Sequence, residues 1–227
     1  MTQLESQLEQ LKDQAIGMMQ MVRTQLIKSR KAFIKRDLDL AREIIHYEDR
    51  VNAMELSIDQ ECEKIFALYK PVAVDLRFVL AVLKANTQLE RIGDHAKAIA
   101  VYTLELDKPY ENKLLKEIRF NEMYETAISM IDDAIHAFNF ENTKLARWIF
   151  GKDAILNEIE EASPEVIGKY IAKHPKRVTK YLMLYSTVKK LERVGDLIKN
   201  VAEETIFYTE AKVLKHRKKQ DKPKEKD

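Results

Sequence analysis

The spacing of apolar residues along the chain is that of amphipathic helices. In one clear example, Leu89, Ile92, Ala96 and Ile99 fall within roughly one third of a helical wheel, which would form a core-facing stripe. The whole chain of 227 residues contains only five glycines and five prolines. A β-sandwich or barrel needs turn residues every eight to twelve positions or so. The pattern therefore predicts an all-α protein.

Residues that break or cap helices divide the chain into six predicted helices. Breaks are expected at 35–37, 70–71, 107–109 and 139–142, and within the region 163–175, which contains Pro164 and Pro175. Asp37 or Asp39 is expected to cap the second helix. The resulting helices would each be about 25 to 35 residues long, a length typical of helical bundles.

The chain repeats itself at a spacing of about one hundred residues. Residues 40–44 (LAREI) recur as 145–149 (LARWI) at a spacing of 105, and residues 89–94 (LERIGD) recur as 191–196 (LERVGD) at a spacing of 102. Such self-similarity indicates a duplicated supersecondary unit. We therefore predict a three-helix bundle over 1–107, a second one over 108–215, and a charged tail over 216–227.

Two acidic pairs occupy the same position in each repeat. Glu90 and Asp94, like Glu192 and Asp196, lie four residues apart, so each pair projects from one face of its helix, away from the core stripe. Carboxylates held by a rigid helix can bind a hard cation. Two acids that correspond at the spacing of 105, Glu48 and Asp153, would supply further ligands. An ordinary solvent-exposed face, with Lys97 offsetting the charge of Asp94, remains an equal alternative.

The same helices carry a glycine and an arginine beside the acids. Gly93 and Gly195 stand in mid-helix, where glycine costs about 1 kcal/mol relative to alanine. They would let another backbone or a ligand approach, or would simply permit tight helix packing. Arg91 and Arg193 lie away from the acidic face on the wheel. They are expected to form surface ion pairs or to contact a partner, rather than to bind phosphate.

Charge and composition narrow the class of protein. The chain has 39 basic and 37 acidic residues, a net charge of +2, which argues against a general nucleic-acid binder. Its single cysteine, Cys62, excludes a disulfide framework and is expected to be a buried apolar residue. No export signal and no membrane-spanning apolar run is seen, so a soluble cytoplasmic protein is expected.

Three segments resemble a known family. Residues 67–77 (ALYKPVAVDLR), 89–96 (LERIGDHA), and 191–196 together with 200–203 (NVAE) are similar to the PhoU family of bacterial phosphate-signalling proteins. The resemblance implies two three-helix bundles with multinuclear metal sites at the E/D-x-x-x-D motifs, holding Fe, Zn, Mn or Mg. The second motif departs from the family pattern, because Leu197 and Ile198 replace the frequent His-Ala. The two motifs are therefore not expected to bind metal equally.

The resemblance also implies a function and partners. Members link the phosphate ABC transporter, through its ATPase subunit, to a membrane sensor histidine kinase, and restrain phosphate-starvation genes when phosphate is plentiful. A homodimer that reaches the membrane only through these partners is expected. An accessory role for a single-component phosphate carrier is the related alternative, and a helical adaptor without metal is a further one.

An enzyme is the remaining alternative. Di-iron carboxylate enzymes build their sites from Glu-x-x-His pairs on facing helices, and Glu43 and His46 have this spacing. The duplicate positions are Trp148 and Gly151, so half of the cage is missing. The sequence has no glycine-rich phosphate loop, nucleophile elbow or HExxH motif. We therefore expect a protein that is not an enzyme.

Overall fold

The computed structural model describes residues 2–212, and within them every regular element is a helix. The predicted tail over 216–227 lies outside the described residues. The all-α prediction is confirmed. The elements in chain order are α1 (Gln3–Lys35), α2 (Leu38–Tyr69), α3 (Ala73–Glu105), α4 (Asn112–Glu117), α5 (Phe120–Asn139), α6 (Thr143–Lys173), the 3-10 turn η1 (Pro175–Arg177) and α7 (Val178–Glu210).

Matching chain reversals begin the second helix of each repeat. Asp37 caps α2, because its side chain accepts a hydrogen bond from the amide of Leu40 at 3.0 Å; Asn142 caps α6 in the same way, from Leu145 at 3.1 Å. The amides of Asp37 and Asn142 donate back to Ala32 and Ala137, each at 2.9 Å. The spacing of 105 residues therefore extends to the end of the first helix of each repeat.

The break predicted within 163–175 falls at the end of that region, at His174, and Pro164 does not end the helix. This proline lies inside α6, which continues to Lys173. Proline lacks the amide that would donate to the carbonyl of Glu160, four residues earlier. The hydroxyl of Ser163 donates to that carbonyl instead, at 2.9 Å. The helix therefore continues past the proline and ends only at His174, before Pro175.

The predicted fourth helix, between the breaks at 107–109 and 139–142, is divided in two. A short helix, α4, ends at Glu117, and α5 begins at Phe120. Between them Arg119 adopts a left-handed conformation, with φ of 55°. Its guanidinium group pairs with Glu122 at 2.7 Å and also with Glu158 of α6. Residues 2–212 thus contain six long helices, as predicted, and one additional short one.

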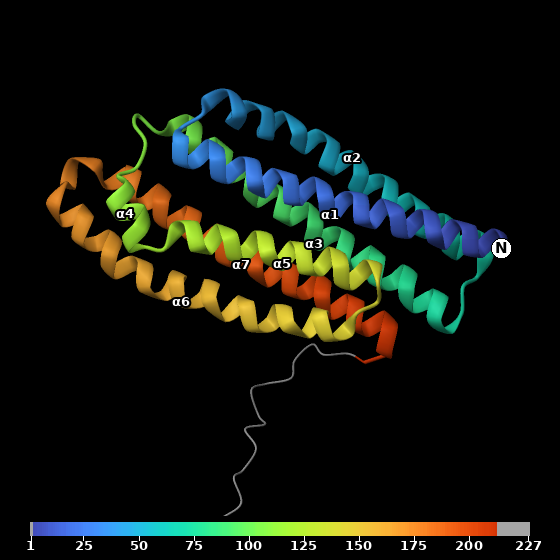
Figure 1. Cartoon of the computed structure of the whole chain (residues 1–227). Helices are drawn as coiled ribbons and strands as arrows, with labels where there is room; N and C mark the ends of the chain where they lie inside the picture. The colour runs from blue at the N-terminus through green and yellow to red at the C-terminus, as the bar shows by residue number, and fades with distance from the viewer. Residues whose placement is uncertain (1, 213–227) are drawn as a thin grey trace, which may run out of the picture.

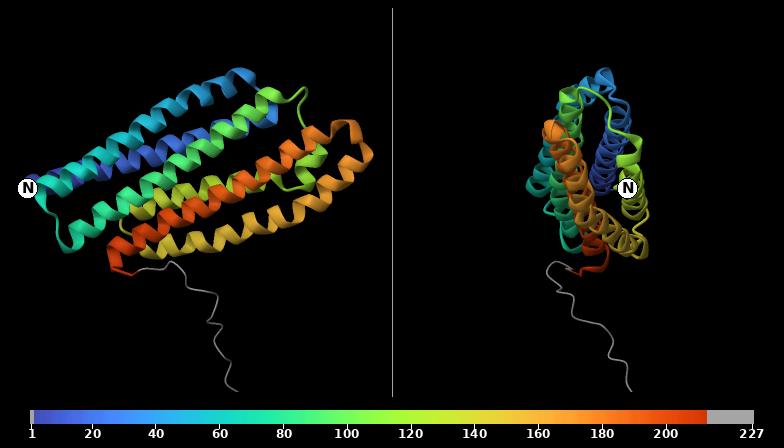
Figure 2. Two further views of the ribbon diagram at one scale, coloured as in Figure 1. Left: turned by 180° about the vertical axis from the view of Figure 1, so that it is seen from behind. Right: turned by 90° about the vertical axis from the view of Figure 1, so that its left-hand side faces the viewer.

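The two repeats lie side by side and share one core. Helices α1, α2 and α3 form one antiparallel bundle and α5, α6 and α7 the other, with α3 against α7 and α1 against α5, so that α2 and α6 lie on the outside (Figures 1 and 2). A single buried cluster contains apolar residues of both repeats. Across this interface, the buried hydroxyls of Ser29 and Tyr124 are 3.1 Å apart. The predicted boundary at residue 107 falls in the connection between α3 and α4.

Among the described helices, none is long and apolar enough to cross a membrane.

Candidate metal site in the first repeat

A buried carboxylate on α2 faces the acidic pair of α3. Glu48 is fully buried, and one of its oxygens, Oε2, accepts a hydrogen bond from the side-chain amide of Gln25 on α1 at 3.0 Å. The other oxygen, Oε1, has no hydrogen-bond partner within residues 2–212. Burying a charged group without a partner is costly. The arrangement therefore leaves one carboxylate oxygen of Glu48 available to a ligand.

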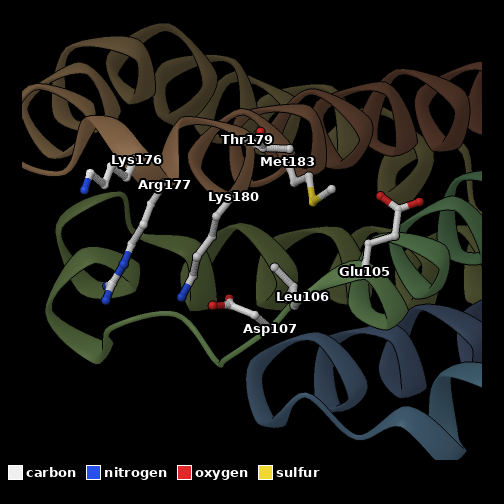
Figure 3. Close-up of a pocket in the computed structure, with 8 residues that line it drawn as sticks. All are labelled: Glu105, Leu106, Asp107, Lys176, Arg177, Thr179, Lys180 and Met183. Atoms are coloured by element: carbon white, nitrogen blue, oxygen red, sulfur yellow. The ribbon is translucent and has the colours of Figure 1, made fainter.

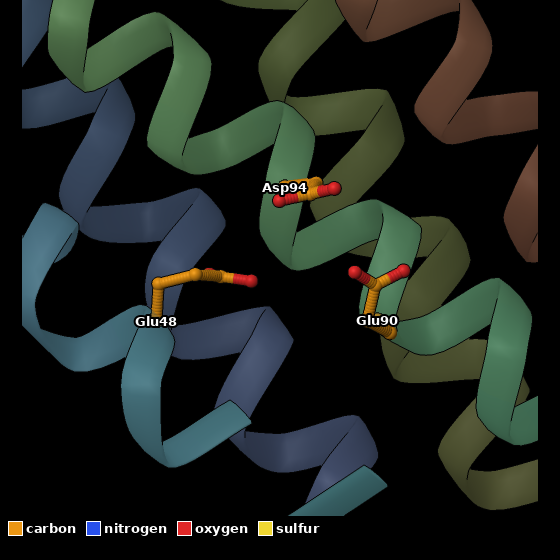
Figure 4. Close-up of side chains that lie close together, drawn as sticks. All are labelled: Glu48, Glu90 and Asp94. Atoms are coloured by element: carbon orange, nitrogen blue, oxygen red, sulfur yellow. The ribbon is translucent and has the colours of Figure 1, made fainter. Parts of the chain in front are cut away.

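Glu48, Glu90 and Asp94 form a compact group of oxygen ligands. One carboxylate oxygen from each residue lies within 4.8 Å of the others, and the three side chains gather between α2 and α3 (Figure 4). Glu90 is half-buried and Asp94 is exposed at the outer edge of the group. In residues 2–212 this is the only group of three or more potential metal ligands with that proximity. The structure thus brings together three of the acids that the sequence singled out.

Burial and repulsion between neighbouring carboxylates raise the pKa values of Glu48 and Glu90. Burial, the nearby charge of Asp94 and to a smaller extent that of Glu90 raise the pKa of Glu48 to about 7. Burial and the charge of Asp94 also raise the pKa of Glu90. A cation among the three groups would offset both effects. All the available ligands are oxygen atoms, which suits hard divalent cations.

Gly93 allows Glu48 to reach the surface of α3. A β-carbon at position 93 would lie 3.1 Å from Oε2 of Glu48 and 3.1 Å from Cγ1 of Val51. One turn along α2, Oδ1 of Asn52 is also buried without a hydrogen-bond partner in the described part of the chain. Gly93 therefore permits close packing of α2 against α3, which was one of the two interpretations of this glycine. The part of α2 that approaches includes Glu48, a potential metal ligand.

The second repeat has a different arrangement of the same residue types. Asp153 is buried, with 5% of its surface exposed. The ammonium group of Lys199 lies 2.7 Å from Oδ2 of Asp153 and 2.7 Å from Oδ1 of Asp196. Glu192 is half-buried, and burial together with the charge of Asp196 raises its pKa. Asp153, Glu192 and Asp196 do not form a group with ligand atoms mutually within 4.8 Å.

The two arginines of the repeated motif share a groove with the acids. Arg91 and Arg193 line a groove of about 580 Å³ between α3 and α7. Its other lining residues are Gln88, Asp94, His95, Asp196, Leu197 and Asn200. The wheel-based expectation that the arginines face away from the acids is therefore wrong, because residues three apart on a helix lie on the same side. The predicted surface ion pair does form for Arg193, which is 3.4 Å from Asp196.

The basic residues of a second pocket are engaged in contacts within the protein. This pocket measures about 210 Å³, lies where η1 and the start of α7 meet the connection after α3, and Arg177 and Lys180 reach across it (Figure 3). Lys180 donates to the backbone carbonyl of Pro109 at 2.8 Å, and Arg177 pairs with Glu111 at 3.2 Å. These cations hold two connections together, so the pocket has a structural explanation.

The Glu-x-x-His pair considered for a di-iron site lies on the surface. Glu43 is exposed and pairs with Lys28 at 2.6 Å, while His46 is exposed and lies 3.8 Å from Asp49 on its own helix. The duplicate residue Trp148 is also largely exposed. The pair therefore does not face the interior of the bundle, where the ligands of such a site are needed.

Sequence reasoning did not identify Gln25, His95 or Lys199 as residues of these sites. Gln25 comes from α1, and no spacing within α2 or α3 points to it. The contact of Lys199 with Asp196 could have been predicted from the sequence, because the two residues are three apart and therefore lie on the same face of the helix. His95 is next to Asp94, and burial followed by the charge of Lys190 lowers its pKa.

Comparison with known proteins gives a consistent result for both repeats. The sequence model of the PhoU domain matches residues 16–103 and again 120–205. The chain is 30% identical over 210 residues to the "Phosphate-specific transport system accessory protein PhoU homolog" of Aquifex aeolicus, covering 92% of this chain and 94% of that protein. It is 31% identical over 216 residues to the homolog from a Burkholderia species, covering 95% and 92% respectively.

Solved structures show the same fold. The crystal structure of PhoU from Pseudomonas aeruginosa superimposes with a TM-score of 0.87 at 27% identity, covering 92% of this chain and 100% of that one. The structure of the phosphate transport system regulatory protein PhoU from Streptococcus pneumoniae gives a TM-score of 0.82 at 25% identity, covering 93% and 99%.

Proposed function

The chain belongs to the PhoU family, and from this premise we propose that it is an accessory regulator of phosphate transport. The observation that carries the proposal is that the PhoU domain matches both repeats, and that relatives aligned over more than nine tenths of the chain are named as accessory proteins of the phosphate-specific transport system. We accordingly propose that the chain acts as a regulatory protein and not as an enzyme.

The finer part of the proposal concerns partners. We place the protein in the cytoplasm, as a homodimer, between the ATPase subunit of a phosphate ABC transporter and a sensor histidine kinase. There it would restrain phosphate-starvation genes when phosphate is plentiful. The groove between α3 and α7 is the proposed contact surface. Its two exposed arginines, Arg91 and Arg193, come from the two repeats and lie beside exposed or half-buried acids, which suits a partner of mixed charge.

A divalent or multinuclear metal, Fe, Zn, Mn or Mg, is proposed for the first repeat, with Glu48, Glu90 and Asp94 as its ligands. The support is the unpartnered, buried oxygen of Glu48 beside two further carboxylates. When bound, the metal would supply the positive charge that three adjacent carboxylates need. The protein residues would hold it at the border between the buried side of α2 and the exposed face of α3.

Deletion of the gene in a phosphate-rich culture tests the regulatory role. We expect phosphate-starvation genes to switch on, and unchanged expression would reject the role. Recovery of partners from detergent-solubilised membranes, with the full chain as bait at high and low phosphate, identifies the transporter. The ATPase subunit is expected; recovery of a single-component phosphate carrier instead would assign the protein to that related system.

The docking surface has a matched test. Arg91→Ala and Arg193→Ala should each reduce recovery of the ATPase subunit. Arg42→Ala is the control, because Arg42 is exposed on α2 and, among residues 2–212, its ion pair is with Asp39 of its own helix. Equal recovery with all three variants would place the contact surface elsewhere.

A further inference from the structure

We infer that in the second repeat the ammonium group of Lys199 takes the place of a metal, so that the chain binds divalent metal through its first repeat alone. The inference rests on the metal site proposed for Glu48, Glu90 and Asp94, and it concerns the corresponding residues Asp153, Glu192 and Asp196. The family resemblance implied metal at both motifs, and the residues of the second do not fit it.

The position of Lys199 provides the first argument. Its ammonium nitrogen is 2.7 Å from one oxygen of Asp153 and 2.7 Å from one oxygen of Asp196, so it bridges a buried acid of α6 and an acid of α7. The ammonium group is therefore held between the two acids, in the position that a divalent ion would need.

The surrounding helices explain why the second repeat needs this lysine. In the first repeat the buried acid, Glu48, receives a hydrogen bond from the neutral amide of Gln25 on α1. The matching chain reversals after α1 and α5 relate the two helices by 105 residues, so the position of Gln25 is taken by Met130. A methionine side chain has no donor to offer. Asp153 consequently obtains its hydrogen bond from Lys199.

The counterpart of Lys199 behaves differently. Lys97 occupies the equivalent position in the first motif at the spacing of 102 residues. In the described chain no ion pair within 4.0 Å joins Lys97 to Glu48, Glu90 or Asp94, whereas Lys199 pairs with both Asp153 and Asp196. Oε1 of Glu48 remains unpartnered. Oδ1 of Asp153 is likewise without a partner in the described chain, so the repeats differ not in an open oxygen but in the ammonium group that bridges Asp153 and Asp196.

Metal binding by single-residue variants tests the inference. The full-length chain is stripped with chelator and dialysed against Mn²⁺, and bound manganese is measured by mass spectrometry. Asp94→Asn should abolish binding, whereas Asp196→Asn should retain the wild-type amount. A loss on Asp196→Asn as large as that on Asp94→Asn overturns the inference, because it would show that the second motif holds metal with its lysine present.

Removing the lysine provides the complementary test. Lys199→Met keeps the side-chain length without the charge, and should bind additional Mn²⁺ that a second substitution, Asp153→Asn, removes again. Lys97→Met is the matched control and should add none. Circular dichroism establishes that each variant is folded; if Lys199→Met does not fold, the comparison of Asp94→Asn with Asp196→Asn decides.

The same experiment separates this inference from the metal site of the proposed function. Wild-type protein without bound Mn²⁺, together with a gain in Lys199→Met, would reject the first-repeat site and still support the role of Lys199. A folded Lys199→Met variant without any gain would overturn that role.

Discussion

The carboxylate of Glu48 lies directly over Gly93. A β-carbon at position 93 would be 3.1 Å from Oε2 of Glu48 and 3.3 Å from Oε1. In the second repeat the carboxylate of Asp153 lies over Gly195 at a comparable 3.1 Å. The mid-helix glycine of each motif therefore permits close approach of the neighbouring helix, by a buried acid in both repeats, together with Val51 at Gly93 and Leu156 at Gly195.

Gly93→Ala should weaken metal binding without loss of helix. The added methyl group would meet both oxygens of Glu48 and Cγ1 of Val51, so the carboxylate must move away from Glu90 and Asp94. We expect the affinity for Mn²⁺, measured by calorimetry, to fall about tenfold or more, a free-energy change of about 1.4 kcal/mol. Gly17→Ala is the control, because nothing lies within 4 Å of its β-carbon position. Wild-type affinity in Gly93→Ala would contradict the proposed ligand role of Glu48.

Gly195→Ala should reduce stability. A β-carbon there would clash with Cδ1 of Leu156, a buried side chain, in addition to approaching Asp153. Overpacking of this kind typically costs about 1 to 3 kcal/mol. Urea denaturation followed by circular dichroism measures it, with Gly168→Ala as a control at an open helical position. A stability equal to that of the control would show that Leu156 can move aside freely.

The stability of the metal-free protein should fall as pH rises from about 4.5 to 7. The pKa of Glu48 is about 7 in the folded chain and near 4.5 when unfolded, so the folded state holds more protons in this interval. Below pH 4.5 Glu48 is protonated in both states and no penalty arises; above pH 7 the buried charge opposes folding. The difference amounts to roughly 3 kcal/mol, at about 1.4 kcal/mol for each pKa unit.

Glu48→Gln is the test of that assignment. This variant should lose most of the pH dependence and should be more stable than the wild type at pH 8 in the presence of chelator. Urea denaturation at a series of pH values measures both effects. An unchanged slope against pH in Glu48→Gln would assign the dependence to another group.

Cys62 should be unreactive until the first repeat unfolds. Its side chain is fully buried, and burial followed by the charge of Asp59 raises the pKa of the thiol to about 12. Because the thiolate is the reactive form, both effects suppress modification. A thiol reagent should label denatured protein at once and native protein only through rare opening. Rapid labelling under native conditions would contradict the burial of this residue.

Tyr124→Phe should show that the two repeats unfold together. The hydroxyl of Ser29 donates to the carbonyl of Leu26, so the hydroxyl of Tyr124 donates to Ser29 across the interface. Its loss should cost about 1 kcal/mol. Labelling of Cys62, which lies in the other repeat, should accelerate by the corresponding factor of about five. A lower unfolding midpoint with unchanged Cys62 labelling would indicate that the repeats open separately.

The sequence alone determined the elements of this protein. Apolar spacing, capping residues such as Asp37 and the doubled LERxGD segment are local features, and helices and their ends depend mainly on such features. The shared face of Glu90 and Asp94 follows from helix geometry in the same way. Pro164 does not end its helix, because a hydroxyl one residue earlier, on Ser163, satisfies the carbonyl that a proline leaves without a donor.

Only the tertiary structure decided what the acidic groups meet. Each buried carboxylate keeps one oxygen without a partner in the described chain, and what its other oxygen meets depends on a neighbour from another helix, Gln25 for Glu48 and Lys199 for Asp153. The helical wheel describes directions around one axis, so it could not show that Arg91 and Arg193 line one groove between α3 and α7. Contacts between helices depend on packing angle and register, and these arise from the shared core of both repeats rather than from either motif.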